Sequence, residues 1–306
     1  MNVLLIGGAG YIGTALLEEL TARKDVSKVI IYDNLSRSNY NLFLDGKKEG
    51  SDKVKFMRGE LLDSRQLSKV LKGIDVVYHL AAKVTTPFAN TDPHFYEQVN
   101  HWGTAELVYA IEESDVKKVI YVSSTAVYGA TSDAVDEKTI PNPRTFYGIS
   151  KYRGEEHVKR LENSRETFIL RCGNVYGYNR SMRFDAVINK FVFEANFNRQ
   201  IQIHGDGKQH RAFVHIRNVA CALARILDNN LETGTYNLVD RNVGVLDIVD
   251  ELKMLIPDLE FIFINQHLKL RQLKVSTNKH LKERLGLKTD MSFTEELREF
   301  LDHFSF

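Results

Sequence analysis

The chain has 306 residues and a formal net charge of +1, so it is long enough for a large core and carries no excess charge for binding a polyanion. No apolar stretch reaches the roughly 18 to 20 residues that a membrane-spanning helix needs. The N-terminus also lacks the basic start and the cleavage site of a signal peptide. We therefore expect a cytoplasmic protein that binds neither nucleic acid nor a membrane.

The cysteine content excludes a disulfide framework. Cys172 and Cys221 are the two cysteines, both lie in apolar surroundings, and neither falls in the spacing of metal ligands. We expect small buried side chains at both positions, a reducing compartment and no metal site.

Short apolar runs alternate with segments of helical periodicity through the first half of the chain. This alternation is typical of a parallel sheet that is covered by helices on both faces. The predicted strands are Val3–Ile6, Lys28–Tyr32, Val54–Met57, Asp75–Tyr78, Val119–Val122 and Thr167–Leu170. The predicted helices begin with Ile12, Leu16 and Leu20 at helical spacing and continue near Ser64–Leu71, Phe95–Glu113 and Tyr147–Leu161.

The second half of the chain has a more mixed pattern. Its predicted elements are a helix at Asp185–Ala195, short strands at Gln200–Ile203 and Ala212–Val214, a helix at Asn218–Leu227, and further segments at Val245–Leu255, Asn278–Leu285 and Phe293–Phe300. The expected fold class is α/β, a Rossmann-type doubly wound parallel sheet with a smaller mixed α/β cap. The sheet domain would take residues 1–173 and 212–237, and the C-terminal substrate-binding cap would take 174–211 and 238–306. Open α/β sheets bind their ligands at the carboxyl edge that such a cap would cover.

A glycine-rich segment follows the first predicted strand and opens the first predicted helix. In Gly7–Gly13, a glycine recurs as G-x-x-G-x-x-G, one residue more than in the usual dinucleotide fingerprint. Gly7 permits a tight turn, Gly10 lets the backbone approach a pyrophosphate, and Gly13 lets the helix pack on the strand. The start of the helix offers free N–H groups and a partial positive charge. The segment therefore predicts a site for a dinucleotide.

Asp33 ends the second predicted strand, where its carboxylate can accept hydrogen bonds from an adenosine ribose. A 2′-phosphate would face that carboxylate, so we expect NAD rather than NADP, although the nearby Arg37 would weaken the preference. A plain glycine-rich turn with a solvated aspartate is the alternative. The combination of strand, loop, helix and acid favours the dinucleotide.

Tyr147 and Lys151 lie four residues apart at the start of a predicted helix, so both side chains project from one face. An ordinary phenol has a pKa near 10, too high for a base at neutral pH. A neighbouring ammonium and a nicotinamide cation both favour the phenolate. The pair is therefore suited to removing a proton from a sugar hydroxyl. Such pairs also occur by chance on amphipathic helices. The position of this pair, after the fifth predicted strand and downstream of the dinucleotide turn, favours the functional interpretation.

Further motifs stand in order along the chain. These are His79–Ala82, Asn100 with Gly103-Thr104, Val122–Gly129, Leu170–Gly177 and Gly205–Arg211. Together with the glycine-rich segment, Asp33 and the Tyr147/Lys151 pair, they make the chain resemble the extended short-chain dehydrogenase/reductase family. The resemblance is to its NAD-dependent nucleotide-sugar epimerase/dehydratase branch, like the UDP-glucose 4-epimerases. It covers nearly the whole chain.

The resemblance implies roles for the matched positions. Ser124 would hydrogen-bond the reacting sugar oxygen, Tyr147 would act as the base, and Lys151 would bind the cofactor ribose and lower the pKa of the phenol. The residues lining NAD would be Gly7, Gly10, Tyr11, Ile12, Gly13, Asp33, Asn34, Glu60, Leu61, Leu80, Ala81, Ala82, Lys83, Asn100, Tyr147 and Lys151. A nucleoside-diphosphate sugar would contact Ser124, Thr125, Asn174, Arg211 and Arg271, with Asn174 and Arg211 on the diphosphate.

Some positions depart from the family pattern. Glu60 stands where the family has an aspartate that contacts adenine, and Arg217-Asn218 replaces a common acidic pair. The usual Arg-Asp before His215 appears as Arg211-Ala212. A late Arg-Pro-Gly-Asp segment is missing, and Arg271 would substitute for it. Because of these changes, the resemblance does not identify the sugar of the substrate.

Several activities share this machinery. The 4,6-dehydratases carry an Asp-Glu pair after the serine, and the related decarboxylases carry a Glu at the second position, whereas this chain has Thr125 and Ala126. Both activities are therefore disfavoured. A 4-epimerase needs only the serine, the tyrosine, the lysine and NAD, and we favour it. A one-way keto-sugar-nucleotide reductase is the alternative. A regulator that binds a dinucleotide without turnover is disfavoured because such relatives lose the tyrosine or the lysine.

The family also implies a homodimer. Its members pair through the helices that correspond to Phe95–Glu113 and Tyr147–Leu161. Apolar residues such as Trp102 and Val108 lie on the first of these helices, although a buried core face explains them equally well.

Overall fold

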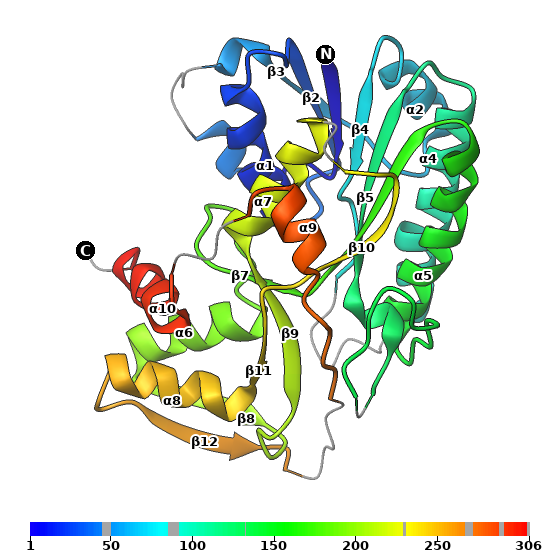
Figure 1. Cartoon of the computed structure of the whole chain (residues 1–306). Helices are drawn as coiled ribbons and strands as arrows, with labels where there is room; N and C mark the ends of the chain where they lie inside the picture. Colours follow the sequence, from blue (N-terminus) through cyan, green and yellow to red (C-terminus); the bar gives the residue numbers. More distant parts are fainter. Residues whose placement is uncertain are drawn as a thin grey trace.

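A seven-stranded parallel sheet forms the centre of the molecule (Figure 1). The computed structural model describes residues 1–44, 50–84, 92–131, 133–228, 231–266, 272–287 and 291–304. The strand order is β10-β6-β5-β4-β1-β2-β3. The strands are β1 Asn2–Ile6, β2 Lys28–Asp33, β3 Val54–Arg58, β4 Val76–His79, β5 Lys118–Ser124, β6 Glu166–Cys172 and β10 Gly234–Leu238. The predicted doubly wound fold is confirmed, and every strand predicted in the first half is present.

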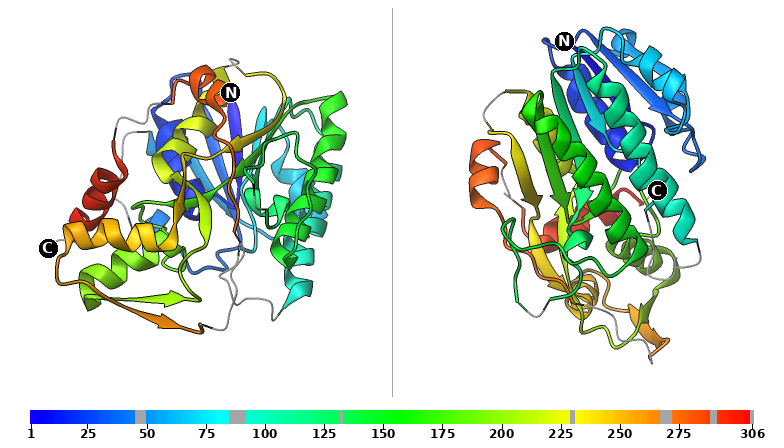
Figure 2. Two further views of the ribbon diagram at one scale, coloured as in Figure 1. Left: turned by 60° about the horizontal axis from the view of Figure 1, so that its bottom comes forward. Right: turned by 90° about the vertical axis from the view of Figure 1, so that its right-hand side faces the viewer.

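Helices cover both faces of this sheet because successive residues of each strand point to opposite sides. Val3 and Leu5 of β1 pack with α1 and α7, whereas Leu4 and Ile6 pack with α2, α4 and α5. Figures 1 and 2 show the two layers on either side of the sheet. The helices are α1 Tyr11–Ala22, α2 Ser64–Val70, α4 Gly103–Glu112, α5 Phe146–Lys159 and α7 Ile216–Arg225.

The single helix predicted at Phe95–Glu113 is interrupted. The structure has α3 at Pro93–Tyr96, a π-helical stretch at Glu97–Trp102, and then α4. A π-helical turn adds a residue to the turn and so rotates the side chains that follow. Here it turns Asn100 inward, where it is fully buried. Hydrophobic periodicity does not reveal such an insertion.

Most of the remaining elements gather beyond the carboxyl ends of the sheet strands (Figures 1 and 2). A three-stranded sheet holds β7 Asn174–Tyr176, β9 His210–His215 and β11 Arg241–Gly244, and a two-stranded sheet holds β8 Gln200–His204 and β12 Glu260–Ile264. The helices here are α6 Val187–Asn198, α8 Val245–Leu255 and α10 Phe293–Asp302, whereas α9 Lys279–Arg284 lies beside α7 and packs on the core of the large sheet. Short 3₁₀ helices lie at Asn41–Phe43, Ser51–Lys53, Thr125–Tyr128, Arg160–Asn163 and Ile226–Asp228. The predicted strand Ala212–Val214 belongs to the three-stranded sheet, and β10 returns to the large one. Where the domains divide stays a prediction.

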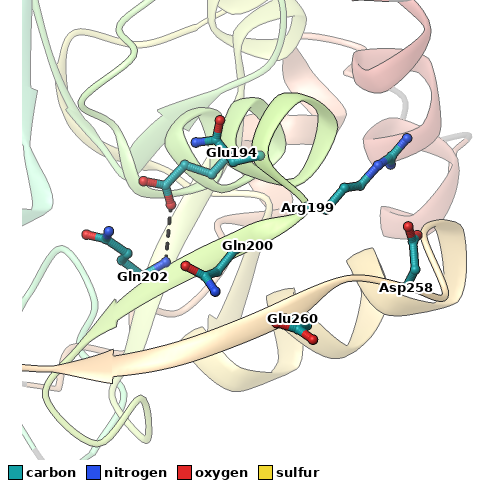
Figure 3. Close-up of a pocket in the computed structure, with 7 residues that line it drawn as sticks. Glu194, Arg199, Gln200, Gln202, Asp258 and Glu260 are labelled. Atoms are coloured by element: carbon teal, nitrogen blue, oxygen red, sulfur yellow. Dashed lines mark hydrogen bonds between the residues drawn. The ribbon is translucent and has the colours of Figure 1, made fainter.

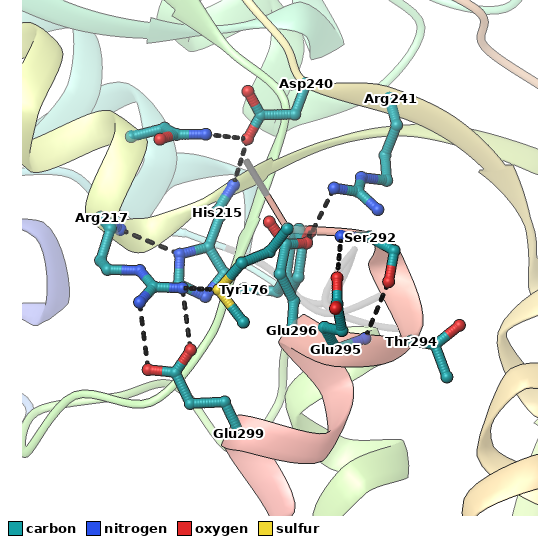
Figure 4. Close-up of polar contacts among 12 residues, drawn as sticks. Tyr176, His215, Arg217, Asp240, Arg241, Ser292, Thr294, Glu295, Glu296 and Glu299 are labelled. Carbon is teal, nitrogen blue, oxygen red and sulfur yellow. Dashed lines mark hydrogen bonds and ion pairs between the residues drawn. The ribbon is translucent and has the colours of Figure 1, made fainter. Parts of the chain in front are cut away.

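Polar contacts anchor the C-terminal helix α10 to the rest of the chain (Figure 4). Arg217 donates to Glu299 at 2.9 Å, and Arg241 pairs with Glu296 at 2.8 Å. Asn218 donates to Asp240 at 2.9 Å. Two residues that depart from the family pattern, Arg217 and Asn218, therefore have structural partners.

The two cysteines are free thiols. Cys172 is buried at the end of β6, as expected. Cys221 on α7 is only partly buried, so the prediction of a buried side chain was wrong there.

Candidate functional site

The turn between β1 and α1 depends on glycine at two places. Gly7 has φ +80°, and a Cβ there would lie 2.5 Å from the backbone of Ala81 in the segment after β4. A Cβ on Gly13 would lie 2.4 Å from the carbonyl oxygen of Gly8. Side chains at either position would push the turn away from its neighbours. The glycines therefore keep a bare backbone surface at the start of α1.

The N-terminus of α1 fits an anionic group. Gly10 is the N-cap, no side chain caps the helix, and the first turn holds no acidic residue. The orphan N–H groups and the helix dipole are then left for a ligand. Tyr11 and Ile12 face inward, and the hydroxyl of Tyr11 donates to the carbonyl oxygen of Gly177 at 2.5 Å. This arrangement suits the diphosphate of the expected NAD.

Polar groups for the nucleoside end lie after β2 and β3. The carboxylate of Asp33 accepts hydrogen bonds from the backbone N–H groups of Ala9, at 3.0 Å, and Leu35, at 2.8 Å. Desolvation raises the pKa of Asp33. Asn34 donates to the carboxylate of Glu60 at 3.0 Å, and the next residue, Leu61, packs on the core beneath α2 and α4. The acid is thus fixed at the edge of the sheet next to the glycine turn.

Asn100 fastens the segment that follows β4. Its amide oxygen accepts from the backbone N–H of Lys83 at 2.7 Å, and its amide nitrogen donates to the Lys83 carbonyl at 2.9 Å. The same nitrogen donates to the hydroxyl of Ser150 on α5 at 3.0 Å. Leu80, Ala81 and the neighbouring Ala82 therefore lie along a segment that is tied both to the π-helical stretch and to α5.

A close backbone contact brings α5 to the end of β5. Ser124 is the last residue of β5, and its hydroxyl accepts from the N–H of Ala126 at 3.2 Å. Thr145 caps α5 by accepting from Gly148 N–H at 3.0 Å. A Cβ on Gly148 would lie 2.5 Å from the carbonyl oxygen of Ala126. Glycine at this position therefore lets the first turn of α5, with Tyr147, reach Ser124.

Tyr147 is a partly buried phenol beside Ser124. Desolvation raises its pKa above 10, and a side-chain hydrogen bond with Ser124 opposes that rise. The positive charge of Arg183 also lowers the pKa. The ring of Tyr96 meets the ring of Tyr147 edge to face, with centroids 6.5 Å apart. Without a further positive charge, the phenol stays protonated at neutral pH.

Lys151 supplies a buried amine one turn along α5. Its side chain is 2% exposed, and Nζ donates to the carbonyl oxygen of Val122 at 2.8 Å. The amine also lies 4.0 Å from the ring centroid of Tyr121. Desolvation lowers the pKa of Lys151 to about 7, against the opposing charge of Glu155. The structure therefore brings Ser124, Tyr147 and Lys151 together at the carboxyl end of β5.

The structure describes four of the five residues that were predicted to hold the substrate. Thr125 follows Ser124 and is buried. Asn174 on β7 and Arg211 on β9 lie in the same three-stranded sheet, and Asn174 donates to the carbonyl oxygen of Ala212 at 3.0 Å. Arg271 lies outside the described residues.

Sequence reasoning missed Arg183. It lies between β7 and α6 and pairs with Asp185 at 2.6 Å. Its charge lowers the pKa of Tyr11, of Tyr96 and of Tyr147. An arginine flanked by apolar residues in a predicted connection was the available signal.

A polar pocket lies away from this site, between α6, β8 and β12 (Figure 3). It is lined by Glu194, Asn198, Arg199, Gln200, Gln202, Asp258 and Glu260. Within the ranges that the structure describes, histidine, cysteine and acidic side chains do not gather in a group of three or more suited to a metal ion. None of the helices in the described part of the chain has the length and hydrophobicity that crossing a lipid bilayer requires.

A family model and curated relatives match most of the chain. The model of the "NAD dependent epimerase/dehydratase family" matches residues 3–239. A putative UDP-glucose 4-epimerase of Methanocaldococcus jannaschii is 34% identical over 258 residues, which cover 82% of this chain and 81% of the relative. A human dTDP-D-glucose 4,6-dehydratase is 31% identical, covering 84% of this chain and 74% of that protein.

Solved structures match nearly the full length. The UDP-glucuronic acid 4-epimerase of Bacillus cereus, in complex with UDP-glucuronic acid and NAD, has a TM-score of 0.86 and 26% identity, covering 99% of this chain and 98% of its own. A UDP-N-acetylglucosamine 4-epimerase of Methanobrevibacter ruminantium, in complex with UDP-N-acetylmuramic acid, has a TM-score of 0.84 and 27% identity, covering 99% and 97%.

The contact between Gly148 and Ala126 can be used to test whether the approach of α5 to β5 sets the geometry of the site. In Gly148→Ala, the new methyl group meets the Ala126 carbonyl, so α5 must shift away from β5. We expect unfolding in urea to show a loss of about 1–3 kcal/mol. Turnover should fall by on the order of 100-fold, since small misplacements of reacting groups are costly.

Gly73→Ala is the matched control. Gly73 has φ +71°, and a Cβ added there would meet no neighbouring atom within 4 Å, so this change strains only the backbone. It should cost stability but leave turnover unchanged. Equal turnover in the two variants would show that the approach of α5 to β5 does not set the geometry of the site.

Proposed function

Because the chain belongs to the NAD-dependent epimerase/dehydratase family of enzymes, we propose that it is a nucleotide-sugar epimerase that oxidises a sugar hydroxyl, at C4 of the sugar, and then returns the hydride. The observation that supports this proposal is the convergence of Ser124, Tyr147 and Lys151 at the end of β5, beside the glycine turn of β1. The relatives include UDP-sugar 4-epimerases, which supports a nucleoside-diphosphate sugar as the substrate.

Three residues, Tyr147, Ser124 and Lys151, would carry out the proton transfer. Bound NAD supplies a hydride acceptor and a positive charge at the nicotinamide ring. Tyr147 takes the proton of the sugar hydroxyl as the hydride leaves the same carbon. Ser124 hydrogen-bonds the reacting oxygen and the phenol. Lys151, in its ammonium form, would bind the cofactor ribose and would stabilise the phenolate by its charge.

The cofactor site is assigned to the edge formed by β1, β2 and β4. The diphosphate would lie on the N–H groups at the start of α1, after Gly10, and the adenosine ribose would face Asp33. Asn34, Glu60 and Leu61 would enclose the adenine. The segment from Leu80 to Lys83, fixed by Asn100, would line the nicotinamide side.

Epimerisation is preferred to dehydration on account of the residues after Ser124. The relatives that are 4,6-dehydratases share 31% identity with this chain, and their family uses an acidic pair to transfer the additional protons. Thr125 and Ala126 occupy these positions here. A buried threonine and an alanine offer no group that titrates near neutral pH. After oxidation, the keto-sugar need only turn over before the hydride returns.

For the substrate, we propose that Asn174 and Arg211 hold the diphosphate and that Thr125 contacts the sugar. Arg271 would contribute from the segment outside the described residues. Arg183 would be a further cation of the site, since its charge lowers the pKa of Tyr147.

Replacement of Tyr147 by phenylalanine tests the base directly. Tyr147→Phe keeps the ring but removes the hydroxyl, so we expect turnover to fall by about 100- to 10,000-fold. The affinity for NAD should stay nearly unchanged. Product NMR with a panel of UDP-, GDP-, CDP- and dTDP-sugars identifies the substrate, and isothermal titration measures NAD binding. Tyr152→Phe on the same helix is the control. Full activity in Tyr147→Phe would remove that residue from its role.

Cofactor retention separates an epimerase from a one-way reductase. An epimerase recovers its NAD in every turnover, whereas a reductase must exchange it. We expect the protein purified by gel filtration to release a stoichiometric amount of NAD when it is heat-denatured. Loss of all cofactor on the column would favour the reductase.

We also propose a homodimer that pairs through α4 and α5. Exposed aromatic side chains lie along α3, the π-helical stretch and the start of α5, namely Phe95, Trp102 and Phe146, with exposed fractions of 38%, 54% and 41%. A second copy of the chain would cover this face.

The single tryptophan of the chain reports on this dimer. Its fluorescence emission should shift to the blue as protein concentration rises, because Trp102 becomes buried. Trp102→Glu should sediment as a monomer, whereas Met254→Glu, at a position on α8 that is 64% exposed, should not change the oligomeric state. A wild-type protein that sediments as a monomer at all concentrations would exclude the dimer.

A further inference from the structure

A fully buried ion pair lies directly behind the catalytic residues. Glu155 on α5 is 0% exposed and Arg171 on β6 is 2% exposed. Arg171 donates to Glu155 from Nη2 at 2.7 Å and from Nε at 3.0 Å. A buried pair of this kind is costly to desolvate and does not by itself indicate stability. Stability alone therefore does not explain why an ion pair is buried next to the catalytic residues.

The pair contacts each element that carries a catalytic residue. Ser123, the residue before Ser124, donates to Glu155 at 2.6 Å. Arg171 donates to the hydroxyl of Tyr128 at 3.0 Å, and Tyr128 ends the 3₁₀ turn that Ser124 begins. Glu155 itself lies one helical turn after Lys151, so both side chains are on the same face of α5.

We propose that Glu155 is a positioning residue whose carboxylate keeps the amine of Lys151 in its ammonium form at the end of β5. Only the role of that ammonium in catalysis rests on the proposed function; its stabilisation by Glu155 does not. Lys151 binds a ribose and stabilises a phenolate as a cation, not as a neutral amine.

The other titratable neighbours of Lys151 are neutral near pH 7. On β4, burial lowers the pKa of His79 well below its usual value. On β5 and β6, burial raises the pKa of Tyr121, and it raises that of Cys172 to about 12. On α5 itself, burial raises the pKa of Tyr147. Among the described residues, Glu155 is therefore the charge that supports the ammonium against its desolvation.

The two partners of the pair should act on Lys151 in different ways. Removing the carboxylate removes the charge that favours the protonated amine, so the pKa of Lys151 falls. Removing the guanidinium leaves the carboxylate without its counter-ion, so the pKa of Lys151 stays where it is or rises. A merely structural pair would lose stability in both cases and would leave the titration of Lys151 alone.

The test is an NMR titration of the cofactor-free full chain that carries ¹³C-labelled lysine. The Lys151 signal is identified by its loss in Lys151→Met. In the wild type we expect a midpoint near the pKa of about 7. In Glu155→Gln it should fall by roughly one unit or more. In Arg171→Met it should lie at or above the wild-type value. A wild-type midpoint in Glu155→Gln, or a lowered midpoint in Arg171→Met, overturns the proposal.

Two further variants keep the outcome interpretable. If Glu155→Gln does not fold, the double variant Glu155→Gln/Arg171→Met removes both charges. Its midpoint should lie below that of Arg171→Met, from which it differs only by the carboxylate, and equal midpoints in these two variants also overturn the proposal. Glu296→Gln breaks the pair between buried Glu296 of α10 and partly buried Arg241, so it should lower stability in urea without changing the midpoint of Lys151. The readout needs neither NAD nor a sugar, so its failure is distinct from a failure of the proposed epimerase.

Discussion

The site depends on the burial of one amine. Lys151 is held against the carbonyl oxygen of Val122 and over the ring of Tyr121, where its charged form is desolvated. A buried ammonium beside a desolvated phenol has a strong effect on that phenol, because little water screens the interaction. The same burial also lowers the pKa of Lys151 and so disfavours its charged form. The surroundings of Lys151 must therefore supply a compensating negative charge, and the carboxylate of Glu155 is placed to do so.

Close backbone contacts let these groups meet. Gly148 allows α5 to touch the turn after β5, and Gly7 allows the β1 turn to touch the segment after β4. Both contacts lie at the carboxyl edge of the parallel sheet, where the strand ends of β1, β4 and β5 converge. The reactive side chains and the bare helix N-terminus thus occupy one region of the molecule, although they come from distant parts of the sequence.

Much of this arrangement could be predicted from the sequence. The buried strands of the large sheet are continuous apolar runs, and the glycine spacing together with Asp33 identifies the dinucleotide turn. The pairing of Tyr147 with Lys151 follows from helical spacing. What could not be predicted depends on tertiary contacts. The π-helical stretch around Asn100 leaves no periodic signal, and β7 and β11 are too short to be recognised. The apolar run Phe261–Ile264 of β12 was a strand signal that the sequence analysis overlooked. The role of Arg183 depends on where its loop lies.

The central claim is that the desolvated phenol of Tyr147 becomes a base when a positive charge joins Lys151 beside it. A spectrophotometric titration of the phenolate band measures this, as the difference between the wild type and Tyr147→Phe. Without NAD, the Tyr147 signal should titrate above pH 10, in line with its raised pKa. With NAD bound, the midpoint should move down towards neutral pH. A midpoint that is the same with and without NAD would contradict the account.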